Sequence, residues 1–209
     1  GKDRVTVHNS LGQTSHANWA QRSVNGQSLR LMERFTGPGC TSCAPANTAW
    51  RYDAQGRVIE TIQLDANGQP SQGERLTLDD WGRTTAVYRV RYQNGQAQTP
   101  ERVARFEYPL PFGDGAEEAQ ALADATQPTL IARHSVVGGQ EKLTRITYNA
   151  HGQVIEVREE GFSPFDAQGQ IKATPINRST HYTYGRINGR SVLMQIDGPL
   201  ANGPKNLPD

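Results

Sequence analysis

The chain has 209 residues, of which 22 are basic and 21 acidic, and its formal net charge is +1. This balance excludes the strongly basic surface that nucleic-acid binding requires, so we expect no nucleic acid among its partners. The sequence contains no apolar run of about 18 residues and therefore predicts no membrane-spanning helix. Apolar residues are fewer than is usual in globular domains, which predicts a thin core in one or two domains.

Turn signals divide residues 1–108 into regular intervals. The turn glycines Gly56, Gly68, Gly82 and Gly95 recur every 12 to 14 residues, and several glycines of the chain follow an asparagine, which is a strong hairpin marker. The Asn-Gly pairs lie at residues 25–26, 67–68, 94–95, 188–189 and 202–203. Within one interval, Val90 alternates with Arg89 and Arg91. We therefore predict antiparallel hairpins with strands of about eight residues, forming a sheet that is apolar on one face.

The two cysteines are Cys40 and Cys43, with two residues between them. A structural zinc ion would need two further ligands, and the sequence has no second cysteine pair of this spacing. A thioredoxin-like redox pair would need a helix that begins at the first cysteine, whereas the residues after Cys43 favour a loop. We favour a local disulfide between Cys40 and Cys43, or two unreactive thiols, and predict no metal or other cofactor.

Residues 52–60 and 148–156 are two copies of one segment. The first copy is Tyr-Asp-Ala-Gln-Gly-Arg-Val-Ile-Glu and the second is Tyr-Asn-Ala-His-Gly-Gln-Val-Ile-Glu. Asp or Asn, a short polar run and then Gly is the residue order of a chain reversal, because Gly adopts a positive φ at little cost. Weaker copies begin at Leu78, Phe165 and Tyr184. The residues that define the repeat are Tyr52, Asp53, Gly56, Arg57, Gly82, Arg83, Tyr148, Asn149, Gly152, Gly169 and Gly189.

The hairpin period breaks between a segment at residues 1–108 and a second one at residues 131–209. Residues 109–130 form a proline-rich connector in which Ala, Glu, Gln and Leu follow Asp114. Asp114 can cap the first turn of a helix, with Glu117 as its reciprocal partner. We predict one short helix near residues 115–125, either within a linker between two β segments or as an inserted docking element.

No catalytic arrangement is evident in the sequence. None of the histidines lies in a metalloprotease or hydrolase motif, and His151 takes the place of Gln55 in the second copy, so we expect an exposed turn residue there. The five histidines are His8, His16, His134, His151 and His181. The glycines are spaced as hairpin turns and not as a phosphate-binding loop. The sequence thus predicts that the chain is not an enzyme.

The repeated segment resembles that of the YD-repeat or Rhs-repeat proteins, whose core is Tyr-Asp-x-x-Gly-Arg. Residues 52–57 match this core in full, and the other copies match it in degenerate form. The family includes bacterial Rhs polymorphic toxins, toxin-complex shell proteins and teneurins. The resemblance implies an all-β antiparallel hairpin meander that forms a curved sheet, part of a shell, with a structural role. It also implies a larger secreted or cell-surface protein whose shell encapsulates or presents a toxin effector domain.

The resemblance implies three partners: neighbouring repeats, the effector domain of the parent protein and a component of a secretion system. The chain ends in mid-connection, so we expect it to be a piece of such a parent. Open sheet edges also predict self-association through edge strands. The alternative function is a β module that binds carbohydrate or a cell surface through exposed aromatic rings. The candidate rings are Trp19, Trp50, Trp81, Tyr182 and Tyr184, and we expect most of them to be buried.

Overall fold

A computed structural model describes residues 2–38, 47–109 and 126–199, and the chain forms two compact units, residues 1–103 and 104–209. The described residues form strands and turns, which confirms the predicted all-β fold. They include no helix, and hence none that could cross a membrane. The helix predicted near residues 115–125 lies outside the described residues, as do Cys40 and Cys43. The predicted connector at residues 109–130 stays a prediction.

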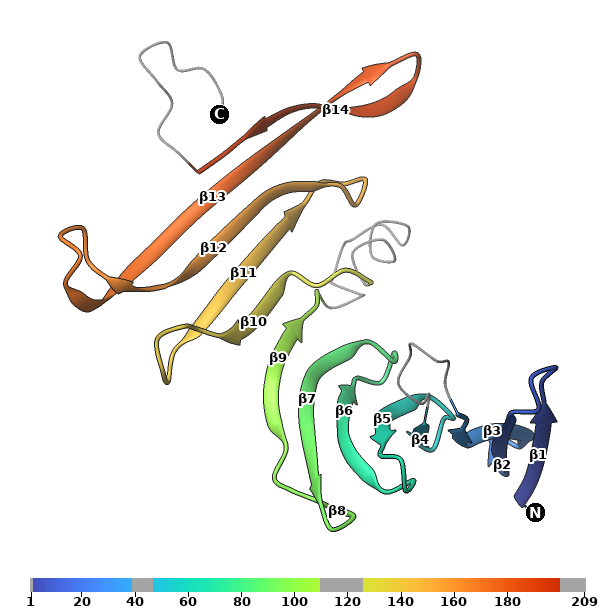
Figure 1. Cartoon of the computed structure of the whole chain (residues 1–209). Coiled ribbons are helices and arrows are strands. Elements are labelled where there is room, and N and C mark those ends of the chain that lie inside the picture. The colour runs from blue at the N-terminus through green and yellow to red at the C-terminus, as the bar shows by residue number, and fades with distance from the viewer. Residues whose placement is uncertain (1, 39–46, 110–125, 200–209) are drawn as a thin grey trace. The chain divides into compact units, whose positions relative to one another are not determined.

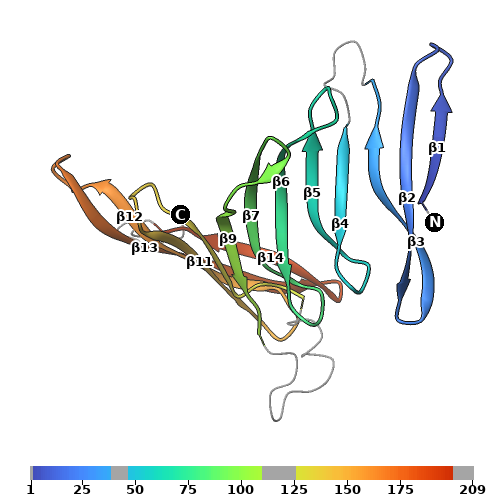
Figure 2. The same cartoon turned by 90° about the horizontal axis from the view of Figure 1, so that it is seen from below.

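The first unit is an antiparallel meander (Figure 1). Its strands pair in chain order from β1 to β7, and β8 pairs with β7. They are β1 (Lys2–His8), β2 (Thr14–Val24), β3 (Gln27–Thr36), β4 (Thr48–Tyr52), β5 (Val58–Leu64), β6 (Pro70–Leu78), β7 (Thr84–Gln93) and β8 (Gln96–Ala97). Figure 2 shows β4 to β7 lying side by side. Sequential pairing follows from the short reversals between neighbouring strands.

The second unit is built in the same way. Strand β9 (Glu101–Glu107) begins in the first unit and ends in the second, where the pairing order runs from β9 to β14. The further strands are β10 (Leu130–His134), β11 (Glu141–Tyr148), β12 (Val154–Phe165), β13 (Ile171–Ile187) and β14 (Arg190–Asp197). Strand β13 has 17 residues, about twice the predicted length, because Gly185 in the weak copy that begins at Tyr184 has no positive φ and the chain reverses only at Asn188-Gly189.

Three Asn-Gly pairs form the two-residue hairpin turns that the sequence predicts. Asn25, Asn94 and Asn188 have φ angles of 49°, 52° and 51°, and the glycine after each also has a positive φ. Positive φ at both central residues gives the turn the twist of the strands that it joins. These turns connect β2 to β3, β7 to β8 and β13 to β14.

The Asn67-Gly68 pair belongs to a different hairpin turn. It lies inside a five-residue reversal in which the backbone N–H of Asp65 donates to the carbonyl oxygen of Gln69 at 2.8 Å. Asp65 Oδ1 also accepts the N–H of Asn67 at 2.9 Å, so the earlier acid sets the turn type. The last predicted pair, at residues 202–203, lies outside the described residues.

The core is thin in both units, as predicted. Val90 is fully buried while its neighbours Arg89 and Arg91 are exposed, which confirms the alternation of the two sheet faces. The buried apolar residues are Ala20, Val24, Ile62, Leu64, Ala86 and Val90 in the first unit and Ala104, Leu130 and Ala132 in the second. Since so few side chains are buried, the stability of each unit depends strongly on cross-strand pairs and turn hydrogen bonds.

Candidate functional site in the repeated turns

Six five-residue turns share one hydrogen-bond pattern, and they are the most regular feature of the molecule. In the turn at residues 53–57, the N–H of Asp53 donates to the carbonyl oxygen of Arg57 at 3.0 Å, and the N–H of Gly56 donates to that of Asp53 at 3.2 Å. Asp53 Oδ1 accepts the backbone N–H groups of Gln55 and Arg57, each at 2.9 Å. The same backbone and Oδ1 bonds recur in the turns at residues 9–13, 65–69, 79–83, 149–153 and 166–170. Each turn therefore begins with a side chain that satisfies two amides of its own reversal.

The backbone conformation at the fourth position of the turn favours glycine. Gly56 has a φ of 76°, a region that side-chain-bearing residues rarely adopt. A Cβ on Gly56 would also lie 3.3 Å from Val24 Cγ2, so the turn packs closely against the neighbouring hairpin. The predicted repeat residues Gly82, Gly152 and Gly169 have φ angles of 85°, 70° and 77° in equivalent turns. Gly189, by contrast, lies in the two-residue turn between β13 and β14.

Two turns combine the acid with an arginine four residues later. Arg57 Nε donates to Asp53 Oδ2 at 2.6 Å, and Arg83 Nε donates to Asp79 Oδ2 at the same distance. Burial raises the pKa of Asp53, but the hydrogen bonds and charge of Arg57 outweigh it and hold that pKa below its usual value. The pKa of Asp79 is lowered in the same way, because Arg83 outweighs the effect of burial.

The turn at residues 149–153 has Asn and Gln where the repeat core has Asp and Arg, and these two side chains still form a hydrogen bond. Asn149 Nδ2 donates to Gln153 Oε1 at 2.9 Å, so the acid–base pair is replaced by an amide pair with the donor on the other side. Asn9 and Gln13 make the same bond at 2.8 Å. His151 is exposed in this turn, as predicted, and its N–H donates to Asn149 Oδ1.

A tyrosine precedes the turn in the strict copy and in the second copy, and it anchors each turn to an earlier part of the chain. Tyr52 Oη donates to the carbonyl oxygen of Met32 at 2.6 Å, and Tyr148 Oη donates to that of Pro128 at 3.0 Å. Both acceptors lie 20 residues before the tyrosine. Burial raises the pKa of both phenols. The tyrosines are therefore neutral donors that bond each turn to an earlier backbone segment, which is β3 for Tyr52 and the residues just before β10 for Tyr148.

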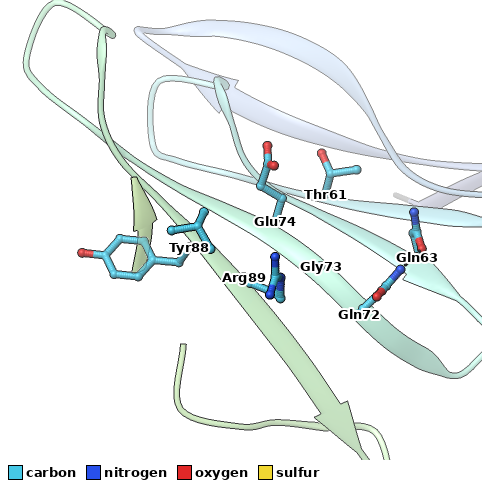
Figure 3. Close-up of a pocket in the computed structure, with 8 residues that line it drawn as sticks. Thr61, Gln63, Gln72, Gly73, Glu74, Tyr88 and Arg89 are labelled. Carbon is cyan, nitrogen blue, oxygen red and sulfur yellow. Dashed lines mark hydrogen bonds between the residues drawn. The ribbon is translucent and has the colours of Figure 1, made fainter. Parts of the chain in front are cut away.

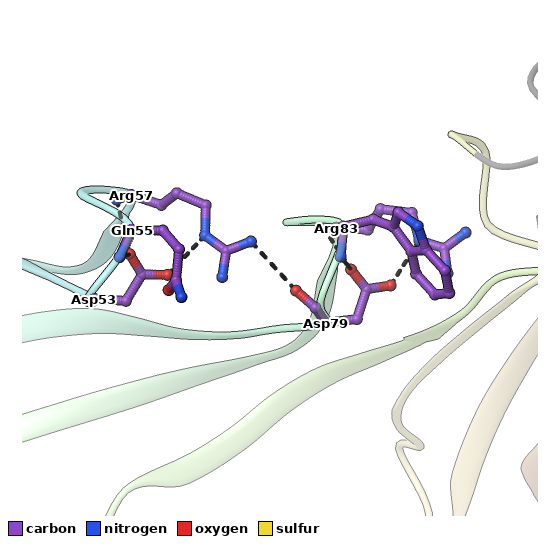
Figure 4. Close-up of polar contacts among 6 residues, drawn as sticks. Asp53, Gln55, Arg57, Asp79 and Arg83 are labelled. Atoms are coloured by element: carbon purple, nitrogen blue, oxygen red, sulfur yellow. Dashed lines mark hydrogen bonds and ion pairs between the residues drawn. The ribbon is translucent and has the colours of Figure 1, made fainter. Parts of the chain in front are cut away.

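Arg57 also joins two successive turns on one margin of the first unit (Figure 4). Its Nη1 donates to the carbonyl oxygen of Asp79 at 3.3 Å, while its Nε holds Asp53. A Cβ on Gly82 would lie 2.9 Å from the same Nη1, so the lack of a side chain there makes room for Arg57. One guanidinium thus links the turn at residues 53–57 to the turn at residues 79–83.

A buried acid in the middle of the sheet was not predicted from the sequence. Glu60 in β5 is 2% exposed, and its Oε1 accepts hydrogen bonds from Arg75 Nη2 at 3.1 Å and Tyr92 Oη at 2.7 Å. Its Oε2 lies 3.3 Å from Arg51 Nη1. Burial and the bond to Glu60 raise the pKa of Tyr92. The two arginines compensate the buried carboxylate, and they flank it on β4 and β6. A signal was available, because Glu60 and Glu156 end the two copies of the repeat.

A shallow depression of about 450 Å³ lies over β5, β6 and β7 (Figure 3). Its polar lining includes Gln63, Gln72, Glu74 and Arg89, and Gln72 Nε2 donates to Gln63 Oε1 at 2.5 Å. Among the described residues, no three His, Cys, Asp or Glu side chains are grouped to hold a metal ion. His8 and His16 lie beside Thr14 and Thr6 across the β1–β2 pair.

The candidate aromatic rings do not form an exposed platform. Trp81 is 58% exposed, whereas the other four rings are half-buried. The Arg83 guanidinium lies 4.9 Å from the centre of the Trp81 ring, and Arg30 lies 5.9 Å from that of Trp19. These contacts are cation–π pairs within the sheet.

No protein-family model and no curated protein matches the sequence. Among solved structures, a porin-like protein from Bacteroides uniformis is similar over 86% of this chain and 89% of its own, with 10% identity and a TM-score of 0.25. TcdB2-TccC3-TEV is similar over 94% of this chain and 15% of its own, with 11% identity and a TM-score of 0.20. At these TM-scores the similarity assigns neither a family nor a function to this chain.

Proposed function

We propose that this chain is a structural wall segment of a YD/Rhs-like shell, which encloses or presents an effector domain in a larger secreted or cell-surface protein. The observation that carries the proposal is the recurrence of one turn pattern six times, with the residues of the repeat core in defined structural roles. The chain has no catalytic activity of its own in this proposal. Its partners are neighbouring repeats, the effector domain and a component of a secretion system.

An array of paired hairpins is stiff although each hairpin buries few side chains. Backbone hydrogen bonds connect each strand to its neighbour, and Arg57 connects the turn at residues 53–57 to the turn at residues 79–83. A wall needs continuity more than a deep core, because each unit gains stability from its neighbours. The small number of buried side chains, which would weaken an enzyme domain, is compatible with the role of a wall segment.

The test is a protease-protection experiment on the parent protein. The downstream domain should stay intact while the shell is folded, and it should become sensitive when Asp53→Ala and Asp79→Ala together destabilise two turns. An unrelated exposed change, Val136→Ala, serves as control because Val136 is 81% exposed. A downstream domain that is digested freely in the unaltered parent would contradict the proposal.

The carbohydrate-binding alternative depends on Trp81, the one candidate ring that is exposed among the five. Titration of neutral oligosaccharides into the isotopically labelled chain would move the Trp81 indole resonance if this alternative holds. Under the wall proposal that resonance should not move.

A further inference from the structure

Strand β14 exposes more large apolar side chains than any other described strand. Val192, Leu193, Met194 and Ile196 are 37%, 43%, 60% and 47% exposed, respectively. Buried positions such as Ile62 and Val90 belong to inner strands that have neighbours on both sides. An apolar cluster of this kind on a soluble protein usually marks an interaction surface.

The outer edge of β14 has one of the usual protections of an edge strand, a bulge at Met194, and lacks the others. It pairs with β13 on one side, and no described strand pairs with it on the other. Natural edge strands commonly carry lysine, proline or a charge in mid-strand, and the eight residues of β14 contain none of these. Strand β1 differs, since Asp3 and Arg4 interrupt it and Asp3 pairs with Arg30 at 3.2 Å.

The charges at the two ends of β14 are opposite. The strand begins with Arg190, continues with mostly apolar residues and ends with Asp197. Two β14 strands paired antiparallel would place Arg190 of each copy beside Asp197 of the other, with the apolar residues between. Parallel pairing would bring like charges together, and pairing with β1 would set Asp3 and Arg4 against the charge-free middle of β14.

We propose that β14 is a self-association edge, through which two copies of this chain pair antiparallel about a two-fold axis. Such an interface uses the same strand of both copies, so assembly closes at the dimer and does not continue into a filament. An eight-residue edge buries less than the roughly 1,600 Å² of a standard stable interface, so we expect a Kd above about 1 µM. In a parent protein with further repeats, a neighbouring hairpin would compete with the second copy for this edge of β14.

Sedimentation velocity over a range from about 5 µM to about 500 µM tests the proposal. The unaltered chain should change from monomer to dimer, with no larger species. Arg190→Asp and Asp197→Arg should each weaken the dimer about tenfold, because each change sets two pairs of like charges against one another. The double variant Arg190→Asp/Asp197→Arg should restore dimerisation, since the charge order is reversed in both copies.

Further variants separate loss of pairing from loss of folding. Met194→Lys adds a charge to the exposed middle of the edge and should abolish the dimer, while Val5→Lys on β1 and Val136→Lys in the turn after β10 should leave it unchanged. Far-ultraviolet circular dichroism should be the same for all of these chains. A chain that is monomeric at every concentration overturns the proposal, as does a dimer that responds to Val5→Lys or that the double charge exchange fails to restore.

Discussion

At the residue scale, the first and last side chains are joined by a hydrogen bond in four of the six turns. Two of the six turns combine Asp with Arg, two combine Asn with Gln and two combine Asp with Gln, but none combines Asn with Arg. An Asn in place of Asp53 would direct its Nδ2 donor toward the Arg57 Nε donor, leaving both unpaired. At residues 149 and 153, Asn and Gln form a donor–acceptor pair that Asn with Arg would lack.

This matching predicts coupled effects of substitutions at Asp53 and Arg57. Asp53→Asn should lower the free energy of unfolding by about 1–2 kcal/mol, because a charge-assisted hydrogen bond is lost. Arg57→Gln should cost stability in the unaltered chain but little or nothing in the Asp53→Asn background. Urea denaturation of the unaltered chain, the two single variants and the double variant gives the coupling energy between residues 53 and 57.

The control for this cycle is Asn9→Asp, which creates the Asp–Gln combination already present at residues 65 and 69. It should change the free energy of unfolding by less than about 0.5 kcal/mol. Equal costs of Arg57→Gln in both backgrounds would show that the two side chains act independently.

The lowered pKa values of Asp53 and Asp79 predict acid sensitivity. A carboxyl whose pKa is lower in the folded chain contributes stability above its unfolded pKa, and this contribution is lost as the pH falls through the folded pKa. Thermal unfolding should therefore occur at lower temperature as the pH falls below about 4. In Asp53→Asn/Asp79→Asn the decrease should be smaller, and an unchanged decrease would assign the acid sensitivity to other groups.

At the element scale, turn glycines with the same φ differ in their surroundings. Gly12 and Gly56 have φ angles of 74° and 76°, but a Cβ on Gly12 would meet no atom within 4 Å, whereas one on Gly56 would meet Val24. Gly12→Ala should cost about 1–2 kcal/mol for the backbone conformation alone. Gly56→Ala should cost more, because the packing between two hairpins must also shift. Chemical denaturation of both variants measures the difference, and equal costs would show that the contact is unimportant.

The contacts of Glu60 with Arg51, Arg75 and Tyr92 link the four strands β4 to β7, so removing the charge of Glu60 should lower stability. Glu60→Gln keeps the shape but sets an amide donor against a guanidinium, so we expect a loss of about 1–3 kcal/mol in the free energy of unfolding. Glu74→Gln, on the exposed face of β6, is the control and should stay within about 0.5 kcal/mol. Similar stabilities of the two variants would mean that water, in place of the Glu60 carboxylate, accepts the hydrogen bonds of Arg51 and Arg75.

The local elements were predictable from the sequence, and the contacts between strands were not. A turn such as residues 53–57 is encoded by an acid and a glycine three residues apart, so its position follows from the sequence alone. The Asn67-Gly68 pair predicted a two-residue turn, but hydrogen bonds to the Asp65 side chain make it part of a five-residue turn. The roles of Tyr52 and Glu60 depend on the register of strands distant in sequence, which no local pattern specifies.

At the scale of the whole molecule, each unit has a small buried centre and weaker margins. In the first unit the centre is formed by Ile62 and Val90, and in the second by Leu130 and Ala132. Local opening costs least where few side chains are buried, so amide hydrogen exchange should be slowest in β5, β7 and β10 and fastest in β1 and β14. Mass spectrometry of peptic fragments measures this order.

The exchange experiment also distinguishes the edge of β1 from that of β14. Both are outer strands in the described residues, so both should exchange quickly in a dilute monomer. If β14 pairs with a second copy, its protection should increase with protein concentration, while that of β1 should stay constant. The Met194→Lys chain should lose the concentration dependence without faster exchange in β5 or β7. Equal protection of the two edges at high concentration would indicate that nonspecific crowding, and not strand pairing, slows the exchange.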